Sequence, residues 1–115
     1  MPLIKLQTSV EADSDKKDKI LKELSKIVSQ TTGKPEQYIM AVFENASIVM
    51  NGNQINGAFV DIRGIGGISK AINTTTSQKI SQMLDRELGI SVKNIYMNFT
   101  DVPGQNWGLN GGVFG

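Results

Sequence analysis

The second half of this 115-residue chain repeats the pattern of the first half, and the repeat limits the folds open to it. Each half contains a short apolar stretch, an amphipathic helical pattern that ends at a glycine, and a second apolar stretch. This succession predicts a β-α-β unit. Two such units in so short a chain cannot wrap a parallel sheet with helices on both sides. We therefore predict an α+β fold, in which the two β-α-β repeats form one four-stranded mixed sheet with two helices on one face.

The first repeat begins with the strand pattern of residues 2–10. A helix is expected within residues 11–33, with Asp13 or Ser14 as its N-cap and Gly33 as its end. Its apolar residues recur at helical spacing and predict one buried stripe, made of Ile20, Leu21, Leu24, Ile27 and Val28. The apolar run at residues 38–44 is nearly continuous, which predicts a strand that is buried on both faces.

The second repeat follows a segment, residues 47–64, that predicts a hairpin or paired short strands with Asn51-Gly52 as the turn. A second helix is expected within residues 69–89. Its apolar positions are Ile72, Ile80, Met83, Leu84 and Leu88. A further strand is expected at residues 94–101.

This architecture leaves one face of the sheet without helices. We expect apolar side chains of residues 38–43 and 58–62 on that face, over a larger area than a monomer usually exposes. Self-association would cover them. The glycine-rich tail at residues 106–115 carries Trp107, Leu109, Val113 and Phe114, and is suited to lie on a neighbouring subunit.

The composition excludes several classes of function. The chain has no Cys and no His, which removes disulfides, thiol nucleophiles, the usual zinc sites and every His-based triad. Its net charge of +1 gives no nucleic-acid footprint. No apolar run approaches the roughly 20 residues of a membrane span, and no signal-peptide pattern begins the chain. We expect one domain over residues 1–115 and a cytoplasmic protein that binds neither membrane, metal nor nucleic acid.

Several motifs together carry a resemblance to a known family. A proline directly follows Met1, and "TGKPEQYIM", "GIGGI", "IYMNF" and "DVPGQNWGLNGGVFG" come later in this order. In this register the chain resembles the macrophage migration inhibitory factor and D-dopachrome tautomerase family over its whole length. The resemblance implies a homotrimer with active sites at subunit interfaces and keto–enol tautomerisation of aromatic 2-oxo acids such as phenylpyruvate, or of dopachrome-type compounds. No cofactor is implied.

The resemblance also implies the site residues. Pro2, freed by removal of Met1, is the catalytic base; Lys34 and the N–H of Ile65 hold the acidic oxygens of the substrate. Tyr96 and Asn98 come from the adjacent subunit. An ordinary α-amino group titrates near 7.7 to 8.0. Loss of water, and the like charge of Lys34 if it lies within about 4 to 6 Å, would lower the pKa of Pro2 toward that of a useful base.

Each site residue also has a simpler interpretation. Pro2 suits the start of a strand, where no backbone N–H is needed. Lys34 is also explained as a solvated cation near a helix C-terminus, and Asn98 as a member of a cross-strand hydrogen-bonded pair. The glycines of the "GIGGI" segment match no nucleotide-binding motif, and are expected to let a ligand approach the backbone closely. Arg63, close to the "GIGGI" segment, is a candidate second cation for a carboxylate.

The chain departs from many animal relatives in one respect. Residues 57–60 replace the CxxC to which a thiol–protein oxidoreductase activity is credited, so we expect that activity to be absent. Phe114 is a candidate wall of the pocket. Pro103, in the segment after Asp101, is expected to reshape the rim of the pocket, so the sequence leaves the substrate preference open. The alternative to an enzyme is a cytokine-like signalling or binding protein of the same trimeric fold, with vestigial tautomerase activity.

Overall fold

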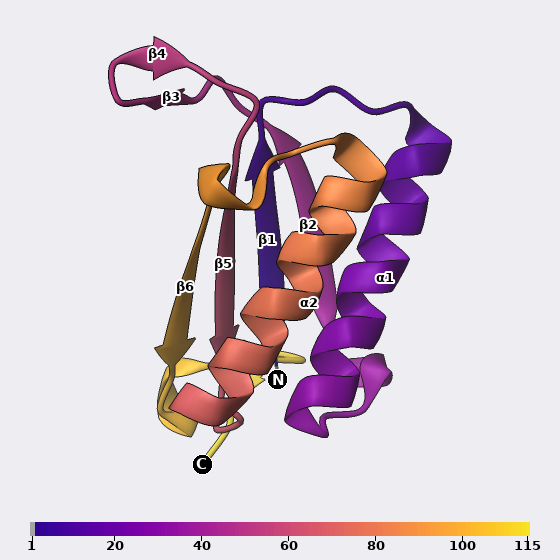
Figure 1. Ribbon diagram of the computed structural model, residues 1–115. Coiled ribbons are helices and arrows are strands. Elements are labelled where there is room, and N and C mark those ends of the chain that lie inside the picture. Colours follow the sequence, from indigo (N-terminus) through magenta and orange to yellow (C-terminus); the bar gives the residue numbers. More distant parts are fainter. Residues whose placement is uncertain (1) are drawn as a thin grey trace.

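Two helices cover one face of a four-stranded sheet in the computed structural model, which describes residues 2–115 (Figure 1). The order across the sheet is β2-β1-β5-β6, with bounds Met40–Asn45, Leu3–Thr8, Ala58–Gly64 and Ile95–Asp101. β1 and β2 are parallel, β5 and β6 are parallel, and β1 is antiparallel to β5. The predicted α+β fold with two β-α-β repeats in one mixed sheet is confirmed.

The helices begin and end at the residues that local chemistry favours. α1 spans Ser14–Thr32, and the Asp13 carboxylate caps it by accepting a 2.8 Å hydrogen bond from the N–H of Lys16. α2 spans Lys70–Leu88 and begins at a serine N-cap. Both helices end at a glycine in the left-handed conformation, Gly33 with φ of 74° and Gly89 with φ of 67°. Both predicted helices are confirmed.

Short elements connect the repeats and close the chain. β3 (Val49–Met50) and β4 (Asn53–Gln54) form the predicted hairpin, with positive φ at both turn residues, Asn51 and Gly52. A second small hairpin near the C-terminus pairs β7 (Gly108–Leu109) with β8 (Gly112–Val113). The single-turn helices are η1 (Glu36–Tyr38), η2 (Val92–Asn94) and η3 (Gly104–Asn106).

The hydrophobic core lies between the sheet and the two helices. Alternate residues of β1 and β5 point toward the helices and are buried, while the intervening residues are not. The buried residues of the core are Ile4, Leu6, Ile20, Leu24, Val28, Ala58, Val60, Ile62, Ile80, Met83, Leu84 and Ile90. Ile72, expected on the buried stripe of α2, is only half-buried, and Thr76 is buried in its place. Thr76 is accommodated because its hydroxyl donates to the Ile72 carbonyl.

The helix-free face of the sheet is more polar than expected. Met40 and Phe59 are exposed there, as predicted, but polar side chains occupy most of the other positions given by strand alternation and register. These polar residues are Lys5, Gln7, Glu44, Asp61, Arg63, Asn98 and Thr100. Burial of the 38–44 strand on both faces is wrong for the single chain, because Met40 is 65% exposed on this face.

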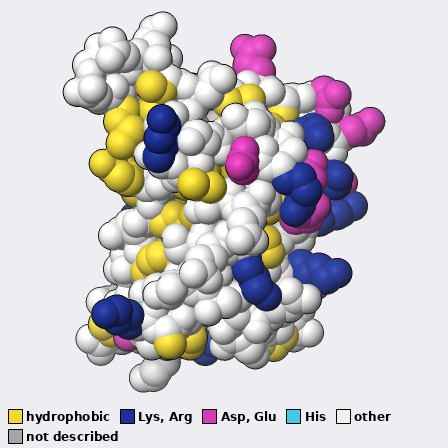
Figure 2. Space-filling view, viewed as in Figure 1, with side chains coloured by type: hydrophobic (Ala, Val, Ile, Leu, Met, Phe, Trp, Pro, Cys, Tyr) yellow, Lys and Arg dark blue, Asp and Glu magenta, His cyan; other side chains and the backbone are white. Residues whose placement is uncertain are grey.

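Charged side chains gather instead around α1 on the helix side (Figure 2). Glu87 of α2 accepts from Lys16 and Lys19 of α1 at 3.1 and 3.2 Å, and from Arg86 at 3.1 Å. Arg86 also pairs with Glu23 of α1. The ion pairs of Glu87 with Lys16 and Lys19, and of Arg86 with Glu23, connect α2 to α1. Neither helix, nor any other in residues 2–115, has the length and apolarity needed to cross a membrane.

Candidate functional site

Lys34 is held in a fixed place after the end of α1. Its carbonyl oxygen accepts a 2.6 Å hydrogen bond from the hydroxyl of Ser29, and its N–H donates to the hydroxyl of Thr32 at 3.3 Å. The Nζ atom donates to the carbonyl oxygen of Ile65 at 3.0 Å. No carboxylate within residues 2–115 forms an ion pair with Lys34. The ammonium group therefore has donors left for an anionic ligand.

The glycines of the "GIGGI" segment make room for Lys34. Gly66 and Gly67 have φ of 70° and 71°, a conformation that other residues rarely adopt. A Cβ atom on Gly67 would lie 3.3 Å from the Cβ of Thr32 and 3.4 Å from the Cε of Lys34. From the sequence, these glycines are expected to let a ligand approach the backbone closely. In the structure, the group that approaches them closely is the side chain of Lys34.

Pro2 is buried at the same end of the sheet. Leu3 pairs with Arg63 in the antiparallel register, so Pro2, one residue earlier, is level with Gly64. Ile65 directly follows Gly64 in the chain. Its carbonyl oxygen accepts from the N–H of Met40 at 3.1 Å. Met1, whose removal would free the Pro2 nitrogen, lies outside the described residues. The structure thus brings Pro2, Lys34 and Ile65 to one end of the sheet.

A cavity of about 350 Å³ opens beside Pro2. Segments far apart in the sequence form its walls, which are mainly apolar and consist of Pro2, Leu3, Gln37, Tyr38, Ile39, Met40, Trp107, Gly108 and Leu109. Apolar and aromatic walls suit the ring of an aromatic ligand. A larger hollow of about 500 Å³ beside Ser9 and Asn56 has no charged side chain in its lining and none of the predicted site residues.

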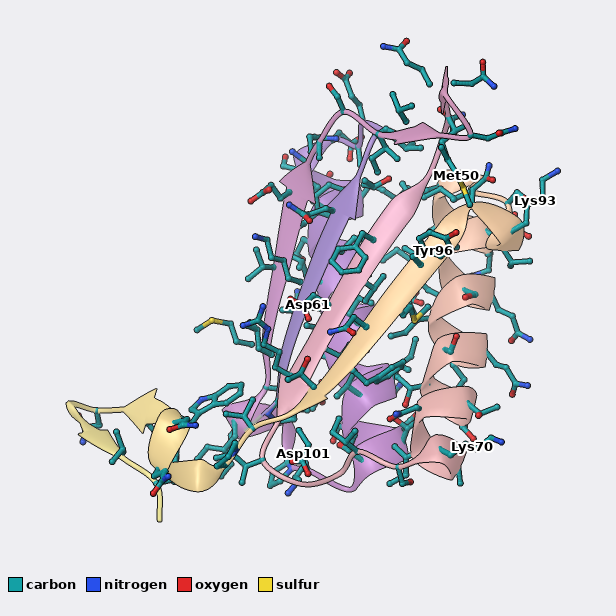
Figure 3. The ribbon with its side chains drawn as sticks, turned by 90° about the vertical axis from the view of Figure 1, so that its left-hand side faces the viewer. Met50, Asp61, Lys70, Lys93, Tyr96 and Asp101 are labelled. Carbon is teal, nitrogen blue, oxygen red and sulfur yellow. The ribbon has the colours of Figure 1, made fainter. Side chains whose placement is uncertain are left out.

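Tyr96 and Asn98 lie elsewhere in the single chain. Tyr96 pairs with Phe59, which pairs with Gln7, so Tyr96 is level with a residue five positions beyond Pro2. At about 3.3 Å per residue this separates the two by at least roughly 16 Å. Figure 3 places Tyr96 near Met50, at the opposite end of the sheet from Asp101. Tyr96 is 67% exposed and therefore free to meet another molecule.

Three other residues make contacts that differ from those expected from the sequence. The Nδ2 of Asn98 donates to the hydroxyl of Thr100 on the same strand at 2.9 Å, instead of to a neighbouring strand. Arg63 lies on the helix-free face and pairs with Asp61 at 2.9 Å, so its charge is already engaged. Phe114 is absent from the cavity lining and packs beside Gly104.

The sequence reasoning missed most of the cavity walls. The predicted strand at residues 38–44 includes Tyr38 and Met40. Met40 does begin β2, but Tyr38 ends the single-turn helix η1, and both residues line the cavity. Trp107 and Leu109 belong to the tail expected to lie on a neighbouring subunit, and within their own chain they line this cavity. The available signal was that Tyr38 falls within the same motif as Lys34, "TGKPEQYIM".

Comparison with known proteins gives one consistent result. The family model described as "Macrophage migration inhibitory factor (MIF)" matches residues 1–115. A macrophage migration inhibitory factor homolog of Trichuris trichiura is 33% identical over 116 residues, covering 99% of this chain and 100% of the relative. The factor from Meriones unguiculatus is 34% identical, with 99% of each chain covered.

Solved structures agree with these sequence matches. The crystal structure of a macrophage migration inhibitory factor-like protein from Entamoeba histolytica superposes with a TM-score of 0.94 at 31% identity, covering 98% of each chain. A homologue from Prochlorococcus marinus gives a TM-score of 0.92 at 33% identity, covering 98% of this chain and 99% of the other. Sequence and fold therefore match over nearly the whole length.

Proposed function

Because the chain belongs to the macrophage migration inhibitory factor family, we propose that it is a cofactor-free keto–enol tautomerase of aromatic 2-oxo acids such as phenylpyruvate. Compounds of the dopachrome type are alternative substrates. One observation carries the proposal: the ammonium group of Lys34 is fixed on the Ile65 carbonyl, without a carboxylate partner in residues 2–115. It lies at the end of the sheet where Pro2 borders an apolar cavity.

The reaction moves protons and leaves the oxidation state of the substrate unchanged overall. In the keto-to-enol direction, the amine of the processed Pro2 accepts a proton from the carbon next to the 2-oxo group. Electrons of that C–H bond form the C=C bond of the enol, and the π electrons of the carbonyl move onto its oxygen. The oxygen then takes up the proton from the protonated Pro2, directly or through water, which regenerates the amine. Lys34 and the Ile65 N–H hold the acidic oxygens. The aromatic ring occupies the cavity beside Trp107 and Tyr38. The enol-to-keto direction reverses each step.

The proposal requires a Pro2 amine that is uncharged near neutral pH. Exclusion of water by the walls of the cavity disfavours the protonated amine, and so does a nearby ammonium group. Both effects lower the pKa of the amine from the roughly 7.7 to 8.0 of an ordinary α-amino group. A base whose pKa lies near the working pH is best suited to abstract a proton next to a carbonyl.

The complete active site in this proposal lies between subunits. The family is typically trimeric, and a homotrimer would place Tyr96 and Asn98 of one subunit beside Pro2 of the next. Two features support this arrangement. Tyr96 is largely exposed, and the register holds it away from Pro2 of its own chain.

Turnover of phenylpyruvate against pH tests the proposal. The native protein should convert enol to keto form with an inflection below the roughly 7.7 of an ordinary α-amino group. Pro2→Gly should lose most of this activity while keeping its circular dichroism spectrum. Mass spectrometry must establish that Met1 is absent from both samples. A Pro2→Gly variant with native turnover, or a native protein that retains Met1 and is active, would remove Pro2 as the base.

The relatives are named as macrophage migration inhibitory factors, which favours one second candidate, a cytokine-like signalling or binding protein of the same fold. In that case tautomerase activity would be vestigial. The same variant separates the two, since Pro2→Gly would abolish turnover and leave a signalling role on the subunit surface unchanged.

A further inference from the structure

A single peptide unit in the loop after β5 is held at both ends by opposite charges. The carbonyl oxygen of Ile65 accepts from the Nζ of Lys34 at 3.0 Å. The N–H of Gly66, which belongs to the same peptide group, donates to Oδ1 of Asp101 at 3.0 Å. Lys34 follows α1 and Asp101 ends β6, so two distant segments meet at this peptide.

This arrangement fixes a part of the loop that would otherwise be free to rotate. Gly66 and Gly67 both have positive φ and no side chain to restrict them. Nearby, the N–H of Val102 donates to the carbonyl oxygen of Gly64 at 2.8 Å, which holds the start of the loop against the same end of β6. The hydrogen bond to Asp101 extends this attachment to the next peptide group, Ile65–Gly66.

The charge of Asp101 adds to the effect of its geometry. Hydrogen bonds to a carboxylate are stronger than those between neutral groups, and hydrogen bonds in a chain polarise one another. An N–H that donates to a carboxylate makes the carbonyl of the same peptide a better acceptor for the ammonium group. Asp101 forms no ion pair within residues 2–115, and its described hydrogen bond is the one to this peptide.

We propose that Asp101 is a positioning residue of the substrate site: through the Ile65–Gly66 peptide it orients the Lys34 ammonium and the neighbouring Ile65 N–H toward the carboxylate of the substrate. Asp101 itself touches no substrate. The inference rests on the proposed function, from which the anionic ligand is taken.

The test measures binding of an acid that cannot tautomerise. Trp107 is the one tryptophan of the sequence and lines the cavity, so its fluorescence reports occupancy. Native protein, Asp101→Ala and Asp101→Asn are titrated with 3-phenylpropionate and with its methyl ester. Asp18→Ala is the matched control, because it removes an exposed aspartate whose ion pair, with Lys22, lies on α1. Exchange of the Gly66 amide hydrogen is followed by NMR in the same four proteins.

We expect Asp101→Ala to weaken binding of the acid about tenfold and that of the ester less than about twofold. Asp101→Asn keeps an acceptor oxygen, and should lie between Asp101→Ala and the native protein. The Gly66 amide should exchange at least about tenfold faster in Asp101→Ala, because its hydrogen bond is lost. Asp18→Ala should match the native protein in all three readings.

Three results would overturn the inference: unchanged acid binding in Asp101→Ala, equal losses for acid and ester, or an unchanged Gly66 exchange rate. A native protein that binds acid and ester equally well would also overturn it, since no anion site would then exist. The proposed function fails by a different result, which is the absence of phenylpyruvate turnover in the native protein. Both binding and exchange are measured without turnover, so the two failures remain distinct.

Discussion

The Nζ atom of Lys34 lies 3.0 Å from the carbonyl oxygen of Ile65, although the two residues stand 31 positions apart in the chain. The contact joins the loop after α1 to the loop after β5. It uses one of the three hydrogens of the ammonium group. The remaining two are available to a ligand, so the contact fixes the position of the cation without neutralising it.

Replacement of Lys34 should therefore affect acids more than neutral ligands. We expect Lys34→Met to raise KM for phenylpyruvate at least about tenfold, because a charge-assisted contact with the carboxylate is lost. Lys34→Arg keeps the charge and should lose less. Steady-state kinetics on the acid and on its methyl ester measure the difference. Equal losses for both compounds would show that Lys34 supports the fold of the site instead of binding the acid group.

Gly67→Ala should disturb the same site through Lys34. The new Cβ would meet the Cβ of Thr32 at 3.3 Å and the Cε of Lys34 at 3.4 Å, so the lysine must move. The positive φ of Gly67 adds about 1–2 kcal/mol of strain to the folded state. We expect KM for phenylpyruvate to rise severalfold, together with a small loss of stability.

Gly52→Ala is the matched control for that variant. Gly52 has φ of 74°, so an alanine there is similarly strained, but its Cβ would meet nothing within 4 Å. Its melting temperature should fall about as much as that of Gly67→Ala while KM stays native. If both variants raise KM to the same extent, strain alone explains the result and the contact with Lys34 does not.

The fold was predictable because its signals are local. Asp13 and Gly33 mark the ends of α1, and Asn51-Gly52 forms the turn of the β3–β4 hairpin as its φ preferences dictate. Each of these residues acts within about four positions of itself. Two equivalent β-α-β repeats in a short chain can be combined most simply in one four-stranded sheet, and the structure contains this sheet.

The cavity was not predictable from the same kind of signal. Tyr38 and Trp107 line the same cavity only because the loop before β2 and the C-terminal segment lie at one end of the sheet. No spacing rule connects positions so far apart. The polarity of the helix-free face was missed for a related reason. In the run at residues 38–44, apolar residues occur on both faces, so the sequence shows no strand alternation there. In β1 and β5 the alternation is clear, and it places Lys5 and Asp61 on the helix-free face.

Mixing two inactive variants should restore activity if the sites lie between subunits. Pro2→Gly lacks the base, and the double variant Tyr96→Ala with Asn98→Ala lacks the residues proposed to come from the neighbour. In mixed trimers, a double-variant subunit supplies Pro2 and a Pro2→Gly subunit supplies Tyr96 and Asn98. Random mixing at equal amounts makes about a quarter of the sites complete. Phenylpyruvate turnover after co-expression measures this fraction.

Separate expression of the two variants, followed by mixing of the folded proteins without exchange of subunits, is the control and should give no recovery. Co-expressed protein that elutes as a trimer but stays inactive would show that Tyr96 and Asn98 do not complete the site of a neighbour. A monomer in size-exclusion chromatography with full native activity would contradict the interface site directly.

Glu87 should determine part of the acid sensitivity of the fold. Its hydrogen bonds to Arg86, Lys16 and Lys19 lower the pKa of its carboxyl from 4.5 to about 2. A group with a lowered folded pKa stabilises the protein above its unfolded value, and this contribution is lost as the pH falls from about 4.5 toward 2. Glu87→Gln should therefore be less stable than the native protein at pH 7, and the difference should shrink steadily below about pH 4.5.

Urea unfolding at a series of pH values measures this difference in stability. The control is Glu11→Gln, which replaces an exposed carboxylate without an ion pair in residues 2–115. A gap between Glu87→Gln and the native protein that stays constant from pH 7 to pH 3 would mean that the shape of the glutamate, and not its charge, joins the two helices.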